Sequence, residues 1–363
     1  MTVRYIGSKS RLIDQISTHI DFPQNGAFFV DAFCGTGVVA EAAASLGWNV
    51  RINDSLYSAV VLAGARLISR EQVPFKGVGG YETAIAKLNE ANPKHGFVWR
   101  AYSPASIETC GIERRYFTKE NAARIDAMRA LIANWSKDGT INEIEERLLI
   151  ADLLSALNRV ANIAGTFGCF LSKWTCQSRE HIAMRCRKLK SKSVHVEATV
   201  GDVFNVANSI NDVVYLDPPY TKRQYASYYH ILETVAVGDE PEVDGVSGLR
   251  PWKYLSSDFC YKVRALGTLV RLIQSLNANK VLLSYSSEGH IRMRDMEAEL
   301  SKIGKPAIYP MGTIGRYRPN KTASIAASDV NEFLVVMERL PQSQTSHVQA
   351  INAHKQAIME TRV

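Results

Sequence analysis

The sequence contains no apolar run that approaches the length of a membrane span, and its first residues include no apolar signal core. We therefore expect a soluble, cytoplasmic protein with no membrane partner. The six cysteines, at positions 34, 110, 169, 176, 186 and 260, form no C-x-x-C pair, which indicates free thiols in a reducing compartment. Cys169, Cys176, His181 and Cys186 are spaced too irregularly to indicate a zinc site, so we expect no metal.

Strand-like runs are nearly absent between residues 70 and 195, and a stretch of this length is too long for a loop. Helical spacing recurs there at 82–91, 119–135 and 143–163, which predicts a helical insertion. The full chain of 363 residues is long for one core, so we expect one large domain that carries an inserted module. The net charge of +7 permits a polyanionic partner but does not by itself indicate one.

The most informative motif is Asp217-Pro218-Pro219-Tyr220, which directly follows the apolar run 213–216. That run predicts a buried strand, and the two prolines fix a stiff turn without backbone donors at its tip. The Asp217 carboxylate and the Pro218 carbonyl are then two acceptors beside the Tyr220 ring. This arrangement suits a planar ring that carries an exocyclic amine: the acceptors hold both N–H groups, and the tyrosine stacks on the ring. A proline turn capped by an aspartate is the structural alternative.

A second motif begins with the short apolar strand 28–30 and continues through the turn Gly35-Thr36-Gly37 into an alanine-rich helix at 38–46. The glycines allow a ligand to approach the backbone. The next strand ends at Asp54, and an acidic residue at this place suits a ribose diol.

The same glycines also fit the dinucleotide fingerprint G-x-G-x-x-A, so a NAD dehydrogenase is one alternative. A P-loop is excluded because no Gly-Lys-Ser/Thr follows them. Two features favour S-adenosylmethionine over NAD. Asp31 and Phe33 precede the glycines, where a carboxylate could bind an ammonium that NAD does not have, and the Asp217 motif has no role in hydride transfer.

The order of strands and helices predicts an α/β fold, an open and mostly parallel sheet with helices on both faces. Ligands bind at the carboxyl ends of such strands, where Gly35, Asp54, Asp202 and Asp217 all fall. The last two strands are expected to form an antiparallel pair. We expect strands at 28–31, 49–53, 196–200, 213–217, 280–284, 307–310 and 332–337, and helices at 11–20, 38–46, 56–69, 262–276 and 293–303.

Basic residues gather in two places, and each is either a solvated surface or a track for phosphates. The first is the end of the helical insertion, with Arg179, Arg185, Arg187, Lys188, Lys190 and Lys192. The second is a predicted hairpin at about 312–328, with Arg316, Arg318 and Lys321. A further irregular insert spans 238–260, and the tail 341–363 is polar.

The two motifs together resemble those of the Dam-type adenine-specific DNA methyltransferases, the class with a DPPY motif. The segment Arg4-Tyr5-Ile6-Gly7-Ser8-Lys9 is similar to the family's N-terminal motif. The segments 157–165 and 222–233 (Leu157-Asn158-Arg159 and Arg223-Gln224-Tyr225 in particular) and the late strand 282–286 also resemble family motifs. The likeness runs in order from Arg4 to about Met337.

The resemblance implies a Rossmann-like S-adenosylmethionine-dependent methyltransferase sheet with an inserted helical module for target recognition. Residues 1–69 and 196–340 would form the catalytic domain, and 70–195 the recognition domain. The resemblance also implies that Tyr5 and Lys9 close over the cofactor and that Asp202 and Val203 contact its adenine. The expected catalytic residues are Asp217, Pro218, Pro219 and Tyr220. The expected cofactor contacts are Tyr5, Lys9, Asp31, Phe33, Gly35, Gly37, Asp54, Asp202, Val203 and Asp217. The expected DNA contacts are Arg185, Arg187, Lys188, Lys190, Arg223, Tyr225, Arg316, Arg318 and Lys321.

The function that follows is methyl transfer from S-adenosylmethionine to the exocyclic amine of a flipped-out adenine in double-stranded DNA, for restriction-modification or genome marking. A bacterial or phage-encoded enzyme is expected. An RNA adenine methyltransferase and a catalytically silent DNA-binding homologue stay open as alternatives. The recognition sequence, a partner restriction endonuclease and the choice between monomer and dimer are also left open by the sequence.

Overall fold

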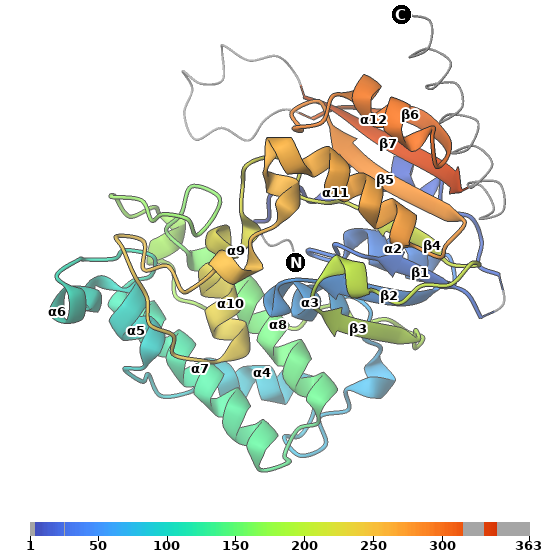
Figure 1. The fold of residues 1–363 in the computed structure, drawn as a ribbon. Coiled ribbons are helices and arrows are strands. Elements are labelled where there is room, and N and C mark those ends of the chain that lie inside the picture. The colour runs from blue at the N-terminus through green and yellow to red at the C-terminus, as the bar shows by residue number, and fades with distance from the viewer. Residues whose placement is uncertain (1–3, 25, 315–329, 340–363) are drawn as a thin grey trace, which may run out of the picture.

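The computed structural model describes residues 4–24, 26–314 and 330–339 (Figure 1). Within them, seven strands form one sheet in the order β3-β2-β1-β4-β5-β7-β6. Strands β1 to β5 run parallel, whereas β7 lies antiparallel between β5 and β6. The strands are β1 (Phe28–Asp31), β2 (Asn49–Asp54), β3 (Val196–Val200), β4 (Val213–Leu216), β5 (Lys280–Ser286), β6 (Gly304–Ile314) and β7 (Val330–Arg339).

Helices cover both faces of the sheet because successive strand residues point to opposite sides. Phe29 packs on the side of α1 and α2, whereas its neighbour Val30 packs on the side of α11 and α12. The predicted α/β architecture is therefore confirmed. The helices around the sheet are α1 (Ile13–Ser17), α2 (Val38–Ser45), α3 (Tyr57–Gly64), α11 (Lys262–Ser275) and α12 (Met293–Leu300).

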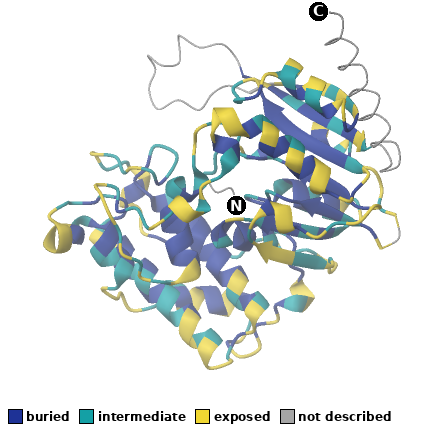
Figure 2. Cartoon of the chain, viewed as in Figure 1, coloured by how far each residue is buried: buried dark blue, intermediate teal, exposed yellow. Residues whose placement is uncertain are grey.

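A second, all-helical part packs beside the sheet and has its own buried core (Figures 1 and 2). Its longest helices begin at polar caps: Thr118 accepts from the backbone of Asn121 at the start of α7, and Asn142 and Glu145 form a reciprocal capping box at the start of α8. Within residues 70–195, where helices were expected, the structure has α4 (Tyr81–Asn89), α5 (Phe97–Tyr102), α6 (Ile107–Cys110), α7 (Lys119–Lys137) and α8 (Glu143–Val160).

The helical core also includes residues from outside 70–195. Helices α9 (Tyr225–Tyr228) and α10 (His230–Val237) follow the Asp217 motif in sequence, yet Tyr229, Ile231 and Leu232 are buried in the helical core. From α10, the buried carboxylate of Glu233 accepts hydrogen bonds from the backbone N–H groups of Tyr57 and Ser58 at 3.0 and 2.9 Å. The helical part thus caps α3, the helix that follows the strand end at Asp54.

Several predicted boundaries differ from the structure. The helix expected at 11–20 begins as a 3-10 turn, η1 (Lys9–Arg11), and the helix expected at 56–69 ends at Gly64. Strand β6 is longer than expected because it stays paired with β7 on both sides of an irregularity between Pro310 and Thr313. Other 3-10 turns are η2 (Arg70–Gln72), η3 (Pro104–Ser106), η4 (Gln177–Arg179), η5 (Val203–Asn205), η6 (Lys253–Leu255) and η7 (Asp258–Cys260).

The antiparallel pair expected at the end of the chain is confirmed as β6 and β7. Arg316, Arg318 and Lys321 of the predicted hairpin, and the tail 341–363, lie outside the described residues. In the part of the chain that the structure describes, no helix has both the length and the apolar character to cross a bilayer.

Candidate active site

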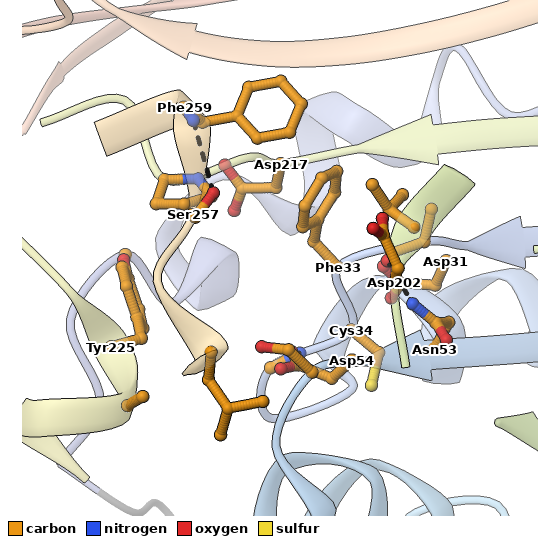
Figure 3. A pocket seen from close by; sticks show the side chains of 18 of the residues that line it. Asp31, Phe33, Cys34, Asn53, Asp54, Asp202, Asp217, Tyr225, Ser257 and Phe259 are labelled. Atoms are coloured by element: carbon orange, nitrogen blue, oxygen red, sulfur yellow. Dashed lines mark hydrogen bonds between the residues drawn. The ribbon is translucent and has the colours of Figure 1, made fainter. Parts of the chain in front are cut away.

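A pocket of about 460 Å³ opens at the carboxyl ends of β1, β2 and β4. This size lies in the range of small-molecule and cofactor sites. Figure 3 shows side chains from these strand ends and from the segment before α11 around one hollow. Many of the residues predicted from the sequence line it: Tyr5, Lys9, Asp31, Phe33, Gly35, Asp54, Asp202, Val203, Asp217, Pro219 and Tyr225.

The glycine turn is covered by the ring of Tyr5. Gly35 has φ +49°, and a side-chain carbon at this position would lie 3.3 Å from the Tyr5 ring. Tyr5 stacks on Tyr229 with ring centroids 4.2 Å apart, and the Tyr229 hydroxyl accepts from the backbone N–H of Ile6 at 2.6 Å. The N-terminal segment is therefore held against the turn by aromatic packing.

Gly37 is required for packing and does not line the pocket. Its φ is +74°, and a side-chain carbon there would stand 2.5 Å from the Cα of Ala63 in α3. The second glycine thus lets α2 approach α3, which is a different role from the ligand contact that we predicted.

Asp31 presents a buried acceptor to this pocket. Its Oδ2 accepts from the backbone N–H of Ala40 at 3.2 Å, whereas its Oδ1 is buried and has no hydrogen-bond partner among the described residues. Burial, together with the nearby carboxylate of Asp217, raises the pKa of Asp31 to about 8. A cationic ligand beside this buried carboxyl group would stabilise its charged form.

Asp54 is oriented by the backbone around it. Its Oδ2 accepts from the N–H of Gly35 at 3.1 Å and its Oδ1 from the N–H of Leu56 at 3.0 Å. Burial raises the pKa of Asp54 to about 6 although these hydrogen bonds lower it. Asp202 is exposed and caps η5 through the N–H of Phe204, and Val203 beside it is buried.

Asp217 lies in a buried group of charges at the tip of β4. The Lys9 ammonium is 3.2 Å from Asp217 Oδ1 and 3.3 Å from Glu332 Oε2 on β7. The Tyr220 hydroxyl is 3.5 Å from Lys9 Nζ and 3.4 Å from Glu332 Oε1. Burial raises the pKa of Asp217 to about 6; Lys9 lowers this pKa and Glu332 raises it. Burial alone would lower the pKa of Lys9, but these carboxylates hold it well above its ordinary value.

Sequence analysis missed Glu332, although one signal was available. In strand β7 it shares alternate positions with the apolar Val330 and Leu334, which places a charged residue on a buried face, and such residues are rarely buried without a partner.

The segment before α11 supplies a wall of the pocket that the sequence analysis did not identify. Ser257 donates its backbone N–H to the side chain of Gln224 at 3.0 Å, and the Phe259 ring meets the Phe33 ring edge-on at 5.6 Å. Tyr225, which we predicted to contact DNA, also belongs to the pocket wall, where its ring packs beside Tyr5.

The predicted basic cluster divides into paired and exposed residues. Arg187 forms an ion pair of 2.7 Å with Asp152, a fully buried carboxylate that also accepts from the Tyr81 hydroxyl. The side chain of Lys190 is 3.5 Å from Glu41 of α2. Arg187 therefore stabilises α8, while Arg185, Lys188 and, elsewhere, Arg223 are exposed.

A mostly parallel sheet with one reversed strand between β5 and β6, and with a glycine turn and an Asp-Pro-Pro-Tyr tip beside one pocket, defines a Rossmann-like methyltransferase. The comparison with protein families gives the particular class: the D12 class N6 adenine-specific DNA methyltransferase family matches residues 5–298, and the chain belongs to this family.

Individual relatives agree with this assignment. The chain is 33% identical to type II methyltransferase M.FokI of Planomicrobium okeanokoites over 346 residues, which cover 93% of this chain and 53% of that protein. It is 31% identical to modification methylase StsI of Streptococcus sanguinis over 351 residues, 94% of this chain and 52% of that protein. It is 28% identical to type II methyltransferase M.NlaIII of Neisseria lactamica over 344 residues, 93% of this chain and 99% of that protein. The chain thus spans about half the length of the first two relatives.

Proposed function

We propose that the chain is a site-specific DNA adenine methyltransferase of a restriction-modification system, which methylates the exocyclic amine of a flipped-out adenine. The observation that carries this proposal is that Asp217 and Pro219 of the motif line the same pocket as Gly35. Family membership supports the reaction, and the names of the relatives support the restriction-modification setting.

Methyltransferases in general use S-adenosylmethionine, and the pocket residues fit this cofactor. The buried Oδ1 of Asp31 suits its ammonium group, since no described residue hydrogen-bonds to this atom, and Asp54 has the acceptors that a ribose diol requires. Phe33, Phe259 and Val203 provide apolar surface for an adenine ring. When bound, the cofactor supplies an activated methyl group on a sulfonium.

The residues of the tetrad position the target amine. The Asp217 carboxylate and the Pro218 carbonyl accept its two N–H groups, which localises the nitrogen lone pair for attack. The Tyr220 ring stacks on the flipped base. The chemical contribution of the protein is chiefly alignment and a desolvated acceptor, because the leaving group is already activated.

The duplex has to lie over the pocket, because an adenine inside a helix does not reach the strand tips and must flip out. Exposed basic residues stand close to the pocket: Arg223 directly precedes Gln224, which holds Ser257, and Lys253 adjoins Tyr254, an exposed residue of the pocket lining. We propose that Arg223 contacts phosphates there.

Other DNA contacts remain predictions from the sequence: the exposed Arg185 and Lys188, and Arg316, Arg318 and Lys321. The helical part, residues 70–195, is proposed to read the target sequence. A partner endonuclease and a cytoplasmic location also belong to this proposal.

The test is radiolabelled methyl transfer by the purified protein to duplex DNA, with methylation-aware sequencing of DNA from cells that express it. N6-methyladenine at one recurrent sequence supports the proposal. Duplex and single-stranded RNA are assayed in parallel, and transfer to RNA alone would favour the RNA alternative. Binding of S-adenosylhomocysteine without transfer to any nucleic acid would favour the silent homologue.

A further inference from the structure

Glu332 occupies an unusual position relative to the candidate active site. It lies near the start of β7, opposite Ser286 of β5, and is only 7% exposed. It is beyond the family match at 5–298 and does not line the pocket. Nevertheless its two carboxylate oxygens lie 3.3 Å from Lys9 Nζ and 3.4 Å from the Tyr220 hydroxyl.

The charges of this group explain what a second carboxylate can do. A buried ammonium requires a partner, and with Asp217 alone Lys9 would be committed to the carboxylate that has to accept the target amine. An acceptor already engaged in an ion pair has less capacity for an incoming N–H group. Because Glu332 lies at nearly the same distance from Lys9 as Asp217 does, it gives the Lys9 ammonium a second carboxylate partner.

Glu332 also contacts Tyr220, the second residue of the motif that it can orient. The hydroxyl of Tyr220 lies near both Glu332 and Lys9, and its ring packs against Tyr285 with centroids 5.3 Å apart. Glu332 therefore holds one end of the ring that is proposed to stack on the target base.

We propose that Glu332 is a positioning residue for methyl transfer, which holds Lys9 away from Asp217 when the target amine binds and fixes the orientation of Tyr220. This inference rests on the proposed function, because it assigns Asp217 as the acceptor of the amine.

The proposal has a signature in the pH dependence. The groups that face Asp217 are Lys9 of η1, Asp31 of β1, Tyr215 of β4, Tyr220 of the tetrad, Tyr225 of α9 and Glu332 of β7. The charge of Glu332 raises the pKa of Asp217, and that of Lys9 lowers it. Without the charge of Glu332, the acid limb of the rate profile should move to lower pH, and the plateau should fall.

The experiment compares Glu332→Gln with Glu338→Gln, a matched control at an exposed residue of the same strand. Glu332→Gln should lower the single-turnover rate by roughly tenfold or more, and the acid limb of its rate profile should move to lower pH. The affinity for S-adenosylhomocysteine should stay within about twofold, since Glu332 does not line the pocket. Glu338→Gln should match the wild type in all three measurements.

A second variant keeps the test decisive if Glu332→Gln folds poorly. Glu332→Asp retains the charge, so it should recover part of the rate and keep the acid limb of the wild type. The proposal is overturned if Glu332→Gln transfers methyl groups like Glu338→Gln. It is also overturned if the single-turnover rate and the affinity for S-adenosylhomocysteine fall together while the acid limb of the rate profile does not shift, because that pattern indicates a purely structural role. Failure of the proposed function looks different: the wild type itself would methylate no DNA.

Discussion

Replacing Asp31 by asparagine should remove one carboxylate from the cofactor pocket while leaving the shape of the pocket nearly unchanged. The Oδ1 atom of Asp31 is buried and meets no hydrogen-bond partner in the described part of the chain, whereas Oδ2 accepts from the backbone N–H of Ala40. An asparagine can still accept from Ala40, but it offers no charge to an ammonium group. We therefore expect Asp31→Asn to fold normally and to bind S-adenosylhomocysteine weakly.

The pH dependence of S-adenosylhomocysteine binding follows from the pKa of Asp31, which is about 8. Below this pH the carboxyl group of the free protein is mostly protonated, and an ammonium beside it favours the charged form. Binding should therefore release a proton, and the affinity should rise about tenfold per pH unit between roughly pH 6.5 and 7.5 and level off above 8. At pH 8 the variant should lose about 2 kcal/mol or more, on the order of 30-fold in Kd.

Isothermal titration calorimetry with S-adenosylhomocysteine, in buffers that differ in ionisation enthalpy, measures both the affinity and the proton release. Asp14→Asn, at an exposed residue of α1, is the control and should behave like the wild type. The reasoning is refuted if the wild type binds equally well from pH 6.5 to 8, or if Asp31→Asn binds as tightly as the control.

Four further outcomes are expected. Asp217→Ala should lower radiolabelled methyl transfer on the order of 10²-fold or more while the protein stays folded and still binds duplex DNA, and activity within a few-fold of wild type would contradict its role. The wild-type single-turnover rate should fall as pH drops below about 6, where Asp217 takes up a proton and ceases to be a charged acceptor; a flat profile down to pH 5 would argue against this. Gly35→Val should weaken S-adenosylhomocysteine binding in calorimetry, because the side chain would crowd the tyrosine ring 3.3 Å away and strain a positive φ; equal affinity would place the cofactor elsewhere. Arg187→Ala should lower the free energy of unfolding in urea by about 3–5 kcal/mol, since it leaves buried Asp152 unpaired, whereas the exposed Lys188→Ala should not; similar small effects in both would indicate a solvated surface.

The strands β1 and β4 at the centre of the sheet could be predicted well because they are short apolar runs with clear ends. The run 213–216 and the tetrad after it are contiguous, so a local pattern was sufficient to place Asp217 at a strand tip. The same holds for Asp31 and Asp54, which end β1 and β2. Parallel strands then bring these carboxylates to one edge without any further information.

The remaining features depend on contacts between distant segments. Glu332 meets Lys9 across 323 residues, and Arg187 meets Asp152 only because the chain returns along α8. Both are charged residues that would be assigned to the surface on sequence alone. The position of Tyr225 could not be predicted for the same reason. An aromatic residue after the tetrad suits a DNA contact, but in the fold the N-terminal segment brings Tyr5 beside its ring.

The way in which α10 joins the helical core has a consequence for protein engineering. Glu233 holds the start of α3, and α10 is buried among helices that precede the tetrad in sequence. The helical part is therefore not a transplantable cassette of residues 70–195. A chimera that exchanged this segment alone would place foreign side chains against α3 and α10, next to the strand end at Asp54. Under the proposed role of the helical part in target recognition, a transplant intended to alter the target sequence has to carry the segment 225–237 with it.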